Sequence, residues 1–415
     1  MRRWFRQRLP SHLGSHRVSQ RRRFHHETPS NIDTVEVTCA SSGSITVDLH
    51  NIALHPPSTP LVIYIPPFSP VPGTHPALPR FLHPYPTAVI NYRWSAPAPT
   101  PEPPTPEEED YFITPLQWPT PLHDTVTAYA WITENLRPLR NSRRDIYIYS
   151  SHAGASIAAS LALTESHSHE RIAVRGLVAW NGIYNWSMFL PDHRINKPAT
   201  ARSRKLPPQP AEGSALHSLQ TEMPNLFRAP VDLFDPFASP SMFFQTAGML
   251  TPQSFSQVSA VTSLLDQLST SAEAETPSDI LSALGAPAKA PRRSGLLFPP
   301  RRSTLKLPAT LLLHDAAPTV IPKRTTKKSA STVGRRRKAG GHTFEAQALE
   351  LSGLMRRSLE KLEFKTRMEW DEDFDEVVEA ERRVSVVDVG DNESLKLGER
   401  GQEVVADWLA ERIRL

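Results

Sequence analysis

The chain has one cysteine, Cys39, among its 415 residues. One cysteine cannot form a disulfide within the chain, and it excludes a cysteine-rich zinc site or an iron–sulfur cluster. No apolar run reaches the eighteen or so residues that a membrane-spanning helix requires. Glycine is scarce, with 17 residues, whereas proline is frequent, with 41. Because no Gly-x-y repeat accompanies the prolines, the composition excludes collagen and indicates folded segments separated by proline-containing loops.

The positive charge of the chain is concentrated at its amino-terminal end. The formal net charge is only +4, yet the first 26 residues contain no acidic residue and eight arginines, at positions 2, 3, 6, 8, 17, 21, 22 and 23. A stretch that is rich in arginine, contains serine and lacks acidic residues is typical of a mitochondrial transit peptide. We therefore predict that residues 1–26 are such a peptide and that the protein is located in the mitochondrial matrix. The alternative is a disordered basic tail that contacts RNA or a membrane. The protein would then be cytoplasmic.

Short apolar runs alternate with helical segments through the rest of the sequence. Residues 35–54 alternate in polarity, which predicts two paired strands joined at Ser42 and Gly43. The apolar runs lie at 61–65, 87–91, 145–149, 174–180, 309–313 and 384–389, and the helical segments at 122–136, 150–166 and 401–415. Buried β-branched runs between helices indicate a parallel sheet that is covered on both faces. We predict an α/β fold with a mostly parallel, doubly wound sheet.

Two long segments interrupt this alternation. Residues 195–305 are rich in proline, serine and alanine, which predicts a cap over the sheet or a partly disordered insertion. Residues 319–382 begin with a basic run between 323 and 338 and end in an acidic helix. Basic runs bind phosphates or nucleic acids in some proteins, but a solvated loop is the more frequent structure. We therefore expect no nucleic-acid partner.

The segment DIYIYSSHAGASIAASLALTES (145–166) combines a strand, a turn of small residues and an alanine-rich helix. This order is typical of the nucleophile elbow of an α/β-hydrolase, in which a strained turn exposes its central side chain. The neighbours two positions away must then be small, as Ser150 and Gly154 are. His152 occupies the central position. We expect Gly154 and Ala155 to have structural roles in this turn.

Further segments resemble the fold-3 group of α/β-hydrolases, which contains the hormone-sensitive-lipase-like carboxylesterases. NYRWSAP (91–97) is similar to the YRLAP strand end of that group, WPTPLHDTVTAYAWITEN (118–135) to its helix before the elbow strand, and LPATLLLHDAAP (307–318) to its strand before the acid loop. The resemblance implies one hydrolase domain with two insertions. The domain then consists of residues 27–194, 306–318 and 383–415, and the insertions are 195–305 and 319–382.

The resemblance also implies a set of catalytic positions. Ester hydrolysis on this fold requires a nucleophilic serine, a histidine base, an acid that orients the base, and backbone N–H groups that bind the oxyanion. His152 offers no hydroxyl at the nucleophile position. The base belongs after the last strand, yet no histidine follows His342.

The remaining two positions are also altered. Pro66, Pro67 and Phe68 occupy the oxyanion loop, and a proline has no N–H to donate. The acid position lies near residues 317–318, and Asp315 is the nearest carboxylate. The four requirements are independent, and the loss of the nucleophile or the base alone removes most of the rate.

Two hypotheses follow, and the sequence leaves open whether the protein is an enzyme. In the first, a degenerate hydrolase acts as a pseudoenzyme that binds a small apolar or acyl ligand, or a protein partner. In the alternative, the protein is an active carboxylester hydrolase in which Ser150 or Ser151 attacks and His152 is the base. We expect no cofactor and no metal, because His167 and His169 have no carboxylate or cysteine cluster beside them.

Overall fold

The computed structural model of the chain describes residues 32–39, 43–71, 74–95, 116–138, 142–197, 210–252, 290–316, 341–371, 373–390 and 395–413. All of these residues belong to one unit, Ile32–Leu415. The predicted transit peptide at 1–26, the basic run at 323–338 and the acid position at 317–318 lie outside the described residues. They stay predictions.

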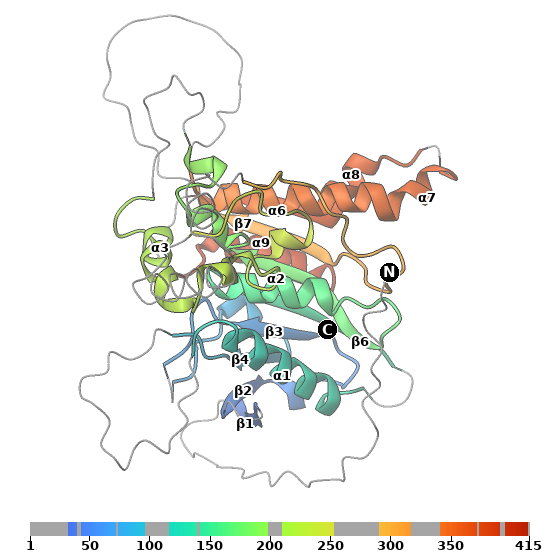
Figure 1. Ribbon diagram of the computed structural model, residues 1–415. Helices are drawn as coiled ribbons and strands as arrows, with labels where there is room; N and C mark the ends of the chain where they lie inside the picture. The colour runs from blue at the N-terminus through green and yellow to red at the C-terminus, as the bar shows by residue number, and fades with distance from the viewer. Residues whose placement is uncertain are drawn as a thin grey trace, which may run out of the picture. The chain divides into compact units, whose positions relative to one another are not determined.

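An eight-stranded sheet lies at the centre of the described residues (Figure 1). Its strand order is β1-β2-β4-β3-β5-β6-β7-β8. β2 is antiparallel to β1 and β4, whereas the pairs from β4 through β8 are parallel. The strands are β1 Ile32–Thr38, β2 Ser44–His50, β3 Leu61–Ile65, β4 Thr87–Asn91, β5 Arg144–Ser151, β6 Ile172–Trp180, β7 Ala309–His314 and β8 Val384–Asp388. The predicted α/β fold with a mostly parallel sheet is confirmed, and so is the pair of strands predicted within 35–54.

Helices cover both faces of this sheet. In β3, Ile63 and Ile65 belong to the apolar cluster that includes α1, α2 and α6, whereas Val62 and Tyr64 belong to the cluster that includes α9. Strands that are buried on both faces are apolar at every position, which is why they appear in the sequence as continuous runs. The helices are α1 Thr120–Asn135, α2 Gly154–Thr164, α3 Ala215–Leu226, α6 Phe344–Leu359, α7 Lys365–Met368, α8 Glu376–Arg383 and α9 Glu399–Ala410.

The two predicted insertions contain packed structure where they are described. α6 lies within the predicted insertion 319–382, and its Leu351, Met355 and Leu359 are buried in the larger apolar cluster. This helix contacts both β7 and β8, which it connects. Within 195–305, α3 buries Leu216 and Leu219 in the same cluster. Parts of both segments therefore belong to the hydrophobic core, and the division of the chain into core and insertions stays a prediction.

A buried ion pair joins the end of β4 to α1. The Asp124 carboxylate is inaccessible to solvent and accepts hydrogen bonds from Arg93 N at 3.0 Å, Nε at 2.9 Å and Nη2 at 2.6 Å. The hydrogen bond to Asp124 and its negative charge raise the pKa of Arg93, against the effect of burial. Arginine and aspartate in the segments 91–97 and 118–135 thus fix the chain direction as it leaves β4.

None of the helices formed by the described residues combines the length and the apolar character that are needed to cross a bilayer.

Candidate functional site at the turn after β5

The turn between β5 and α2 has a strained backbone at its tip. His152 adopts a left-handed conformation with φ of 49°, which few residues other than glycine adopt and which often marks functional sites. Its N–H donates to the Trp180 carbonyl at 3.1 Å, and its carbonyl accepts from Ile183 N at 3.2 Å. The turn is therefore held against the end of β6, and the central side chain of the predicted elbow is an imidazole.

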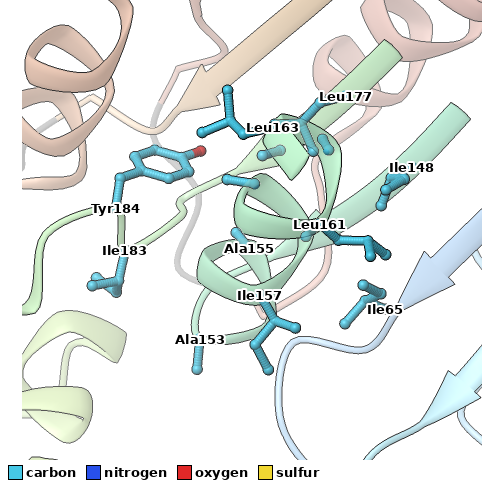
Figure 2. Packing of buried hydrophobic residues seen from close by; sticks show 14 of the residues in the cluster. Ile65, Ile148, Ala153, Ala155, Ile157, Leu161, Leu163, Leu177, Ile183 and Tyr184 are labelled. Carbon is cyan, nitrogen blue, oxygen red and sulfur yellow. The ribbon is translucent and has the colours of Figure 1, made fainter. Parts of the chain in front are cut away.

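Small residues surround this tip because the backbone of the β3 loop approaches it closely. A Cβ atom on Gly154 would lie 2.1 Å from the Pro66 carbonyl oxygen and 2.8 Å from Ser150 Oγ. Ala155 is fully buried. Figure 2 shows Ala153 and Ala155 at the start of α2, with Ile65 on one side and Ile183 and Tyr184 on the other. A larger side chain at position 154 would displace the loop.

The His152 ring is enclosed by aromatic side chains. Its centroid lies 4.9 Å from that of Trp180 and 5.7 Å from those of Phe68 and Phe344. Only 1% of the residue is exposed, and within the described residues its Nδ1 has no hydrogen-bond partner. Burial lowers the pKa of His152 to about 4. The imidazole is therefore neutral at pH 7.

The two serines beside His152 have different surroundings. Ser150 is fully buried, and its hydroxyl donates to the Ile65 carbonyl at 2.7 Å, so it fastens β5 to β3. Ser151 is 4% exposed and pairs with Trp180 of the neighbouring strand β6. Neither hydroxyl bonds to an imidazole in the part of the chain that the structure describes.

Asp315 lies just after β7 and contacts the same region through Trp180. Its Oδ1 accepts from Trp180 Nε1 at 2.9 Å, and its Oδ2 accepts from Asn181 Nδ2 at 2.6 Å. Asp315 N in turn donates to Asn181 Oδ1 at 2.9 Å. Burial raises the pKa of Asp315, while the bonds from Trp180 and Asn181 oppose that rise. The carboxylate therefore orients an indole and an amide rather than an imidazole.

The loop after β3 presents acceptors toward the elbow. The Pro66 carbonyl accepts from the Tyr92 hydroxyl at 3.1 Å, and the Pro67 carbonyl accepts from Gly154 N at 3.1 Å. The Phe68 side chain lies against His152 and is 37% exposed. An oxyanion requires N–H donors at this place, and two of the three residues here are prolines.

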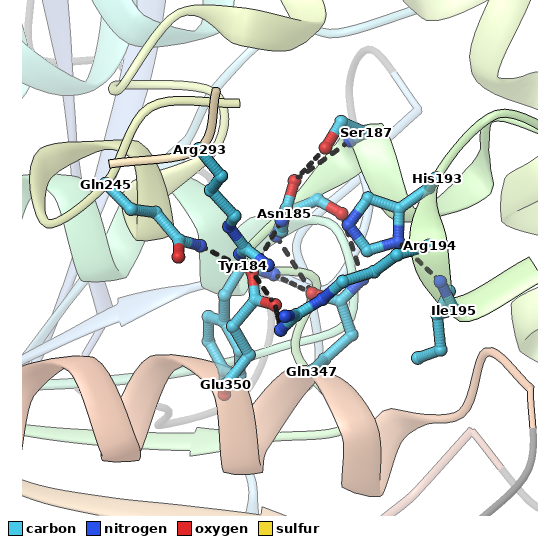
Figure 3. A network of polar contacts seen from close by, with 10 residues as sticks. All are labelled: Tyr184, Asn185, Ser187, His193, Arg194, Ile195, Gln245, Arg293, Gln347 and Glu350. Carbon is cyan, nitrogen blue, oxygen red and sulfur yellow. Dashed lines mark hydrogen bonds and ion pairs between the residues drawn. The ribbon is translucent and has the colours of Figure 1, made fainter. Parts of the chain in front are cut away.

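The sequence did not indicate a buried polar network on the neighbouring helix α6. The Glu350 carboxylate accepts from Asn185 Nδ2 at 2.6 Å and Gln245 Nε2 at 2.8 Å, and it pairs with Arg293 at 3.0 Å (Figure 3). Gln347, one turn earlier, accepts from the backbone N–H groups of residues 184 and 185, both at 2.9 Å. The signal that we missed is two polar residues three positions apart on the buried face of a helix.

Two further histidines belong to this network. Gln347 Nε2 lies 2.8 Å from His342 Nε2, and His193 Nδ1 accepts from Ile195 N at 3.3 Å. Burial lowers the pKa of His342 to about 3 and that of His193 to about 4. His342 closely precedes the start of α6, and Phe344, the first residue of that helix, packs against His152. The network therefore also holds the residue that packs on His152.

The described residues contain no group of three or more histidine, cysteine or acidic side chains arranged to hold a metal ion. His167 and His169 lie with ring centroids 5.7 Å apart. His167 Nδ1 is bonded to Thr304 Oγ1 at 2.8 Å, and His169 pairs with Glu170 at 3.2 Å.

The strand order, the antiparallel second strand and the sharp turn after β5 decide the fold class. The fold is of the α/β-hydrolase type. No protein-family model matches the sequence, and no curated protein does.

Solved structures that resemble this chain include several esterases. Carboxyl esterase 2 from Tuber melanosporum is 10% identical, with 93% of this chain and 87% of that chain covered and a TM-score of 0.43. An esterase from Rhizomucor miehei is 11% identical, with 92% and 82% covered and a TM-score of 0.45. EstE1, a carboxylesterase from a metagenomic library, is 16% identical, with 52% and 66% covered and a TM-score of 0.35. The chain thus spans just under two thirds of EstE1, and 59% of a hyperthermophilic esterase from Pyrobaculum calidifontis.

Proposed function

We propose that this protein uses an α/β-hydrolase scaffold to bind a ligand and does not hydrolyse esters through a serine triad. The observation that carries this proposal is His152, a neutral imidazole in an aromatic enclosure at the tip of the elbow. A serine hydrolase needs at that tip a hydroxyl that an imidazole deprotonates. The loss of the nucleophile or the base alone lowers kcat about a millionfold in a serine protease.

The contacts of the other candidate residues support the same proposal. Ser150 donates its proton to a backbone carbonyl, and Asp315 is bonded to Trp180 and Asn181. Pro66 and Pro67 supply no N–H groups to an oxyanion. Ser150 and Asp315 thus stabilise the turn and the strand ends, and this structural role does not require catalysis.

The rings around His152 favour an apolar or acyl ligand. Phe68 is partly exposed and lies over the imidazole, so an apolar group has an aromatic surface to contact. A protein partner that covers this surface is the alternative.

A second candidate function is carboxylester hydrolysis with Ser151 as the nucleophile. It is favoured by the position of Ser151, which is the last residue of β5 and directly precedes His152. It is disfavoured because Ser151 is only 4% exposed and, among the described residues, its hydroxyl forms no hydrogen bond with the neighbouring imidazole.

Hydrolysis of p-nitrophenyl acetate and butyrate separates the two candidates. We expect the wild-type rate to equal those of the variants His152→Ala, Ser150→Ala and Ser151→Ala, because none of these side chains is part of a triad. A fluorophosphonate probe should label neither serine.

Both assays need an active serine esterase as a positive control, so that a negative result is informative. Labelling that disappears in Ser151→Ala, together with a rate that falls in His152→Ala, would establish the hydrolase instead.

We also propose a mitochondrial location, supported by the eight arginines and the absence of acidic residues in positions 1–26. We expect these residues to direct a fused fluorescent protein into mitochondria. A fusion in which the arginines are replaced by glutamine is the control and should stay in the cytoplasm. Cytoplasmic fluorescence of the unaltered fusion would favour the basic tail.

A further inference from the structure

A cavity of about 310 Å³ lies away from the elbow, between the segment 299–307 and the end of α6 with the turns that follow it. The segment precedes the amino end of β7, whereas Asp315 follows the carboxyl end of the same strand. The strand has six residues and therefore spans about 20 Å. The cavity and the elbow thus lie at opposite edges of the sheet.

Positive side chains surround this cavity. Arg301, Lys306, Lys361 and Lys365 line it, and none of the four has an ion-pair partner among the described residues. Glu363 is the one carboxylate in the described lining, and it pairs with Arg383 at 2.9 Å. The cavity therefore has a positive potential that its own residues do not neutralise.

Hydrogen bonds fix both walls of the cavity. Lys306 N donates to the Ser166 carbonyl at 3.1 Å, and Ser168 N donates to the Thr304 carbonyl at 3.1 Å. At the other wall, Ser358 Oγ donates to the Phe298 carbonyl at 2.6 Å and accepts from Phe298 N at 3.2 Å. The backbone that carries the four cations is therefore in place before any ligand arrives, which lowers the entropic cost of binding.

The second wall continues into a π-helix, Glu360–Phe364. Such wide turns are rare, and they occur frequently at functional sites. Here the π-helix places Lys361 and Leu362 in the cavity lining, next to Lys365 in the turn that follows. Charged and apolar lining residues thus lie side by side.

We propose that this cavity binds a small organic phosphate. Lysine and arginine are the side chains that bind phosphate oxygens, and four of them around one cavity match a group with two negative charges. A volume of about 310 Å³ is at the lower end of the range for small-molecule sites. Pro299, Leu305 and Leu362 offer apolar surface to the organic part.

The proposal goes beyond the binding function proposed above, because it gives a ligand class to a second site at the opposite edge of the sheet. It depends on this cavity alone. A failed phosphate-binding test leaves the hydrolysis assay unaffected, and an active esterase would leave the phosphate site in place.

Isothermal titration of the full chain with pyrophosphate, and with adenosine monophosphate against adenosine, tests the proposal. We expect the two phosphates to bind and adenosine to bind much more weakly. The variant Lys306→Gln/Lys361→Gln should weaken phosphate binding about a hundredfold, about tenfold for each charge-assisted hydrogen bond. Both lysines are exposed, so the variant should keep the stability of the wild type.

Arg400→Gln is the matched control, because Arg400 is an exposed residue on α9 that does not line the cavity. It removes one positive charge and should leave the affinity unchanged. The proposal is wrong if the wild type does not bind pyrophosphate at millimolar concentration. It is equally wrong if Arg400→Gln and the double lysine variant weaken binding to the same extent, since the attraction would then be general and not local.

Discussion

Replacing Gly154 with alanine should destabilise the fold by about 3 kcal/mol, as over-packing of a rigid site does. The added Cβ would lie 2.1 Å from the Pro66 carbonyl oxygen and 2.8 Å from Ser150 Oγ. Neither atom can move freely, because Pro66 O accepts from the Tyr92 hydroxyl and Ser150 Oγ donates to the Ile65 carbonyl. Urea unfolding, followed by far-ultraviolet circular dichroism, measures the change.

Gly353→Ala is the matched control within the same fold. Gly353 lies on α6, and a Cβ there would meet nothing within 4 Å. Alanine stabilises a helix interior by about 1 kcal/mol relative to glycine, so this variant should be slightly more stable than the wild type. If both variants are equally stable, the loop after β3 yields more readily than its hydrogen bonds indicate, and the tight elbow is not required for folding.

The sheet could be predicted from the sequence because its strands are short, apolar and buried on both faces. The runs at 61–65 and 87–91 have the same bounds as β3 and β4. The sequence did not predict that β5 continues to Ser151, because the predicted apolar run ends at residue 149 and the two serines that follow are polar. They remain in the strand because Ser150 bonds to the neighbouring strand and Ser151 pairs with Trp180.

The sequence did not identify α6 as a helix of the hydrophobic core. The basic run at 323–338 suggested a solvated loop, and the helix that follows has a mixed composition in which Gln347 and Glu350 appear as surface residues. The structure buries Gln347 and leaves 9% of the Glu350 side chain exposed, because their partners come from segments more than a hundred positions away, such as Asn185 and Gln245. Contacts between residues so far apart in the sequence produce no recognisable pattern in the sequence of the helix itself.

The elbow was visible in the sequence, whereas the surroundings of its central residue were not. Ser150, His152 and Gly154 have a recognisable spacing. The spacing gives no indication that Trp180 and Phe344 enclose the imidazole, or that Trp180 also bonds to Asp315. Only the fold brings these residues together, and their positions decide whether the imidazole is charged.

Mild acid should destabilise this protein strongly. Burial lowers the pKa of His152 to about 4, that of His193 to about 4 and that of His342 to about 3. Each imidazole binds a proton in the unfolded chain near pH 6.5 but not in the folded chain until the pH is far lower. The three histidines therefore cost no stability above about pH 6.5. As the pH decreases toward 4, each of them lowers the free energy of unfolding by about 1.4 kcal/mol per pH unit.

Between about pH 6.5 and pH 5 each histidine then costs about 2 kcal/mol, and the three together about 6 kcal/mol. Glu165 acts in the opposite direction, because burial raises its pKa to about 6. Its stabilising contribution is present below about pH 4.5 and is lost as the pH rises through 6. One carboxyl group offsets only part of the loss from three imidazoles, so the net change remains a loss in acid.

Two variants identify the source of the acid sensitivity in urea unfolding at about pH 7.5 and pH 5. His152→Asn keeps a residue that tolerates positive φ, and His342→Gln keeps a hydrogen-bond acceptor for Gln347. Each should lose about 2 kcal/mol less than the wild type on acidification. His123→Gln, at an exposed position of α1, should behave like the wild type. If His152→Asn loses as much stability as the wild type does, burial does not lower the pKa of His152, and the imidazole is protonated in the folded protein at pH 5. The aromatic rings around His152 would then not exclude water from the imidazole as their contacts indicate.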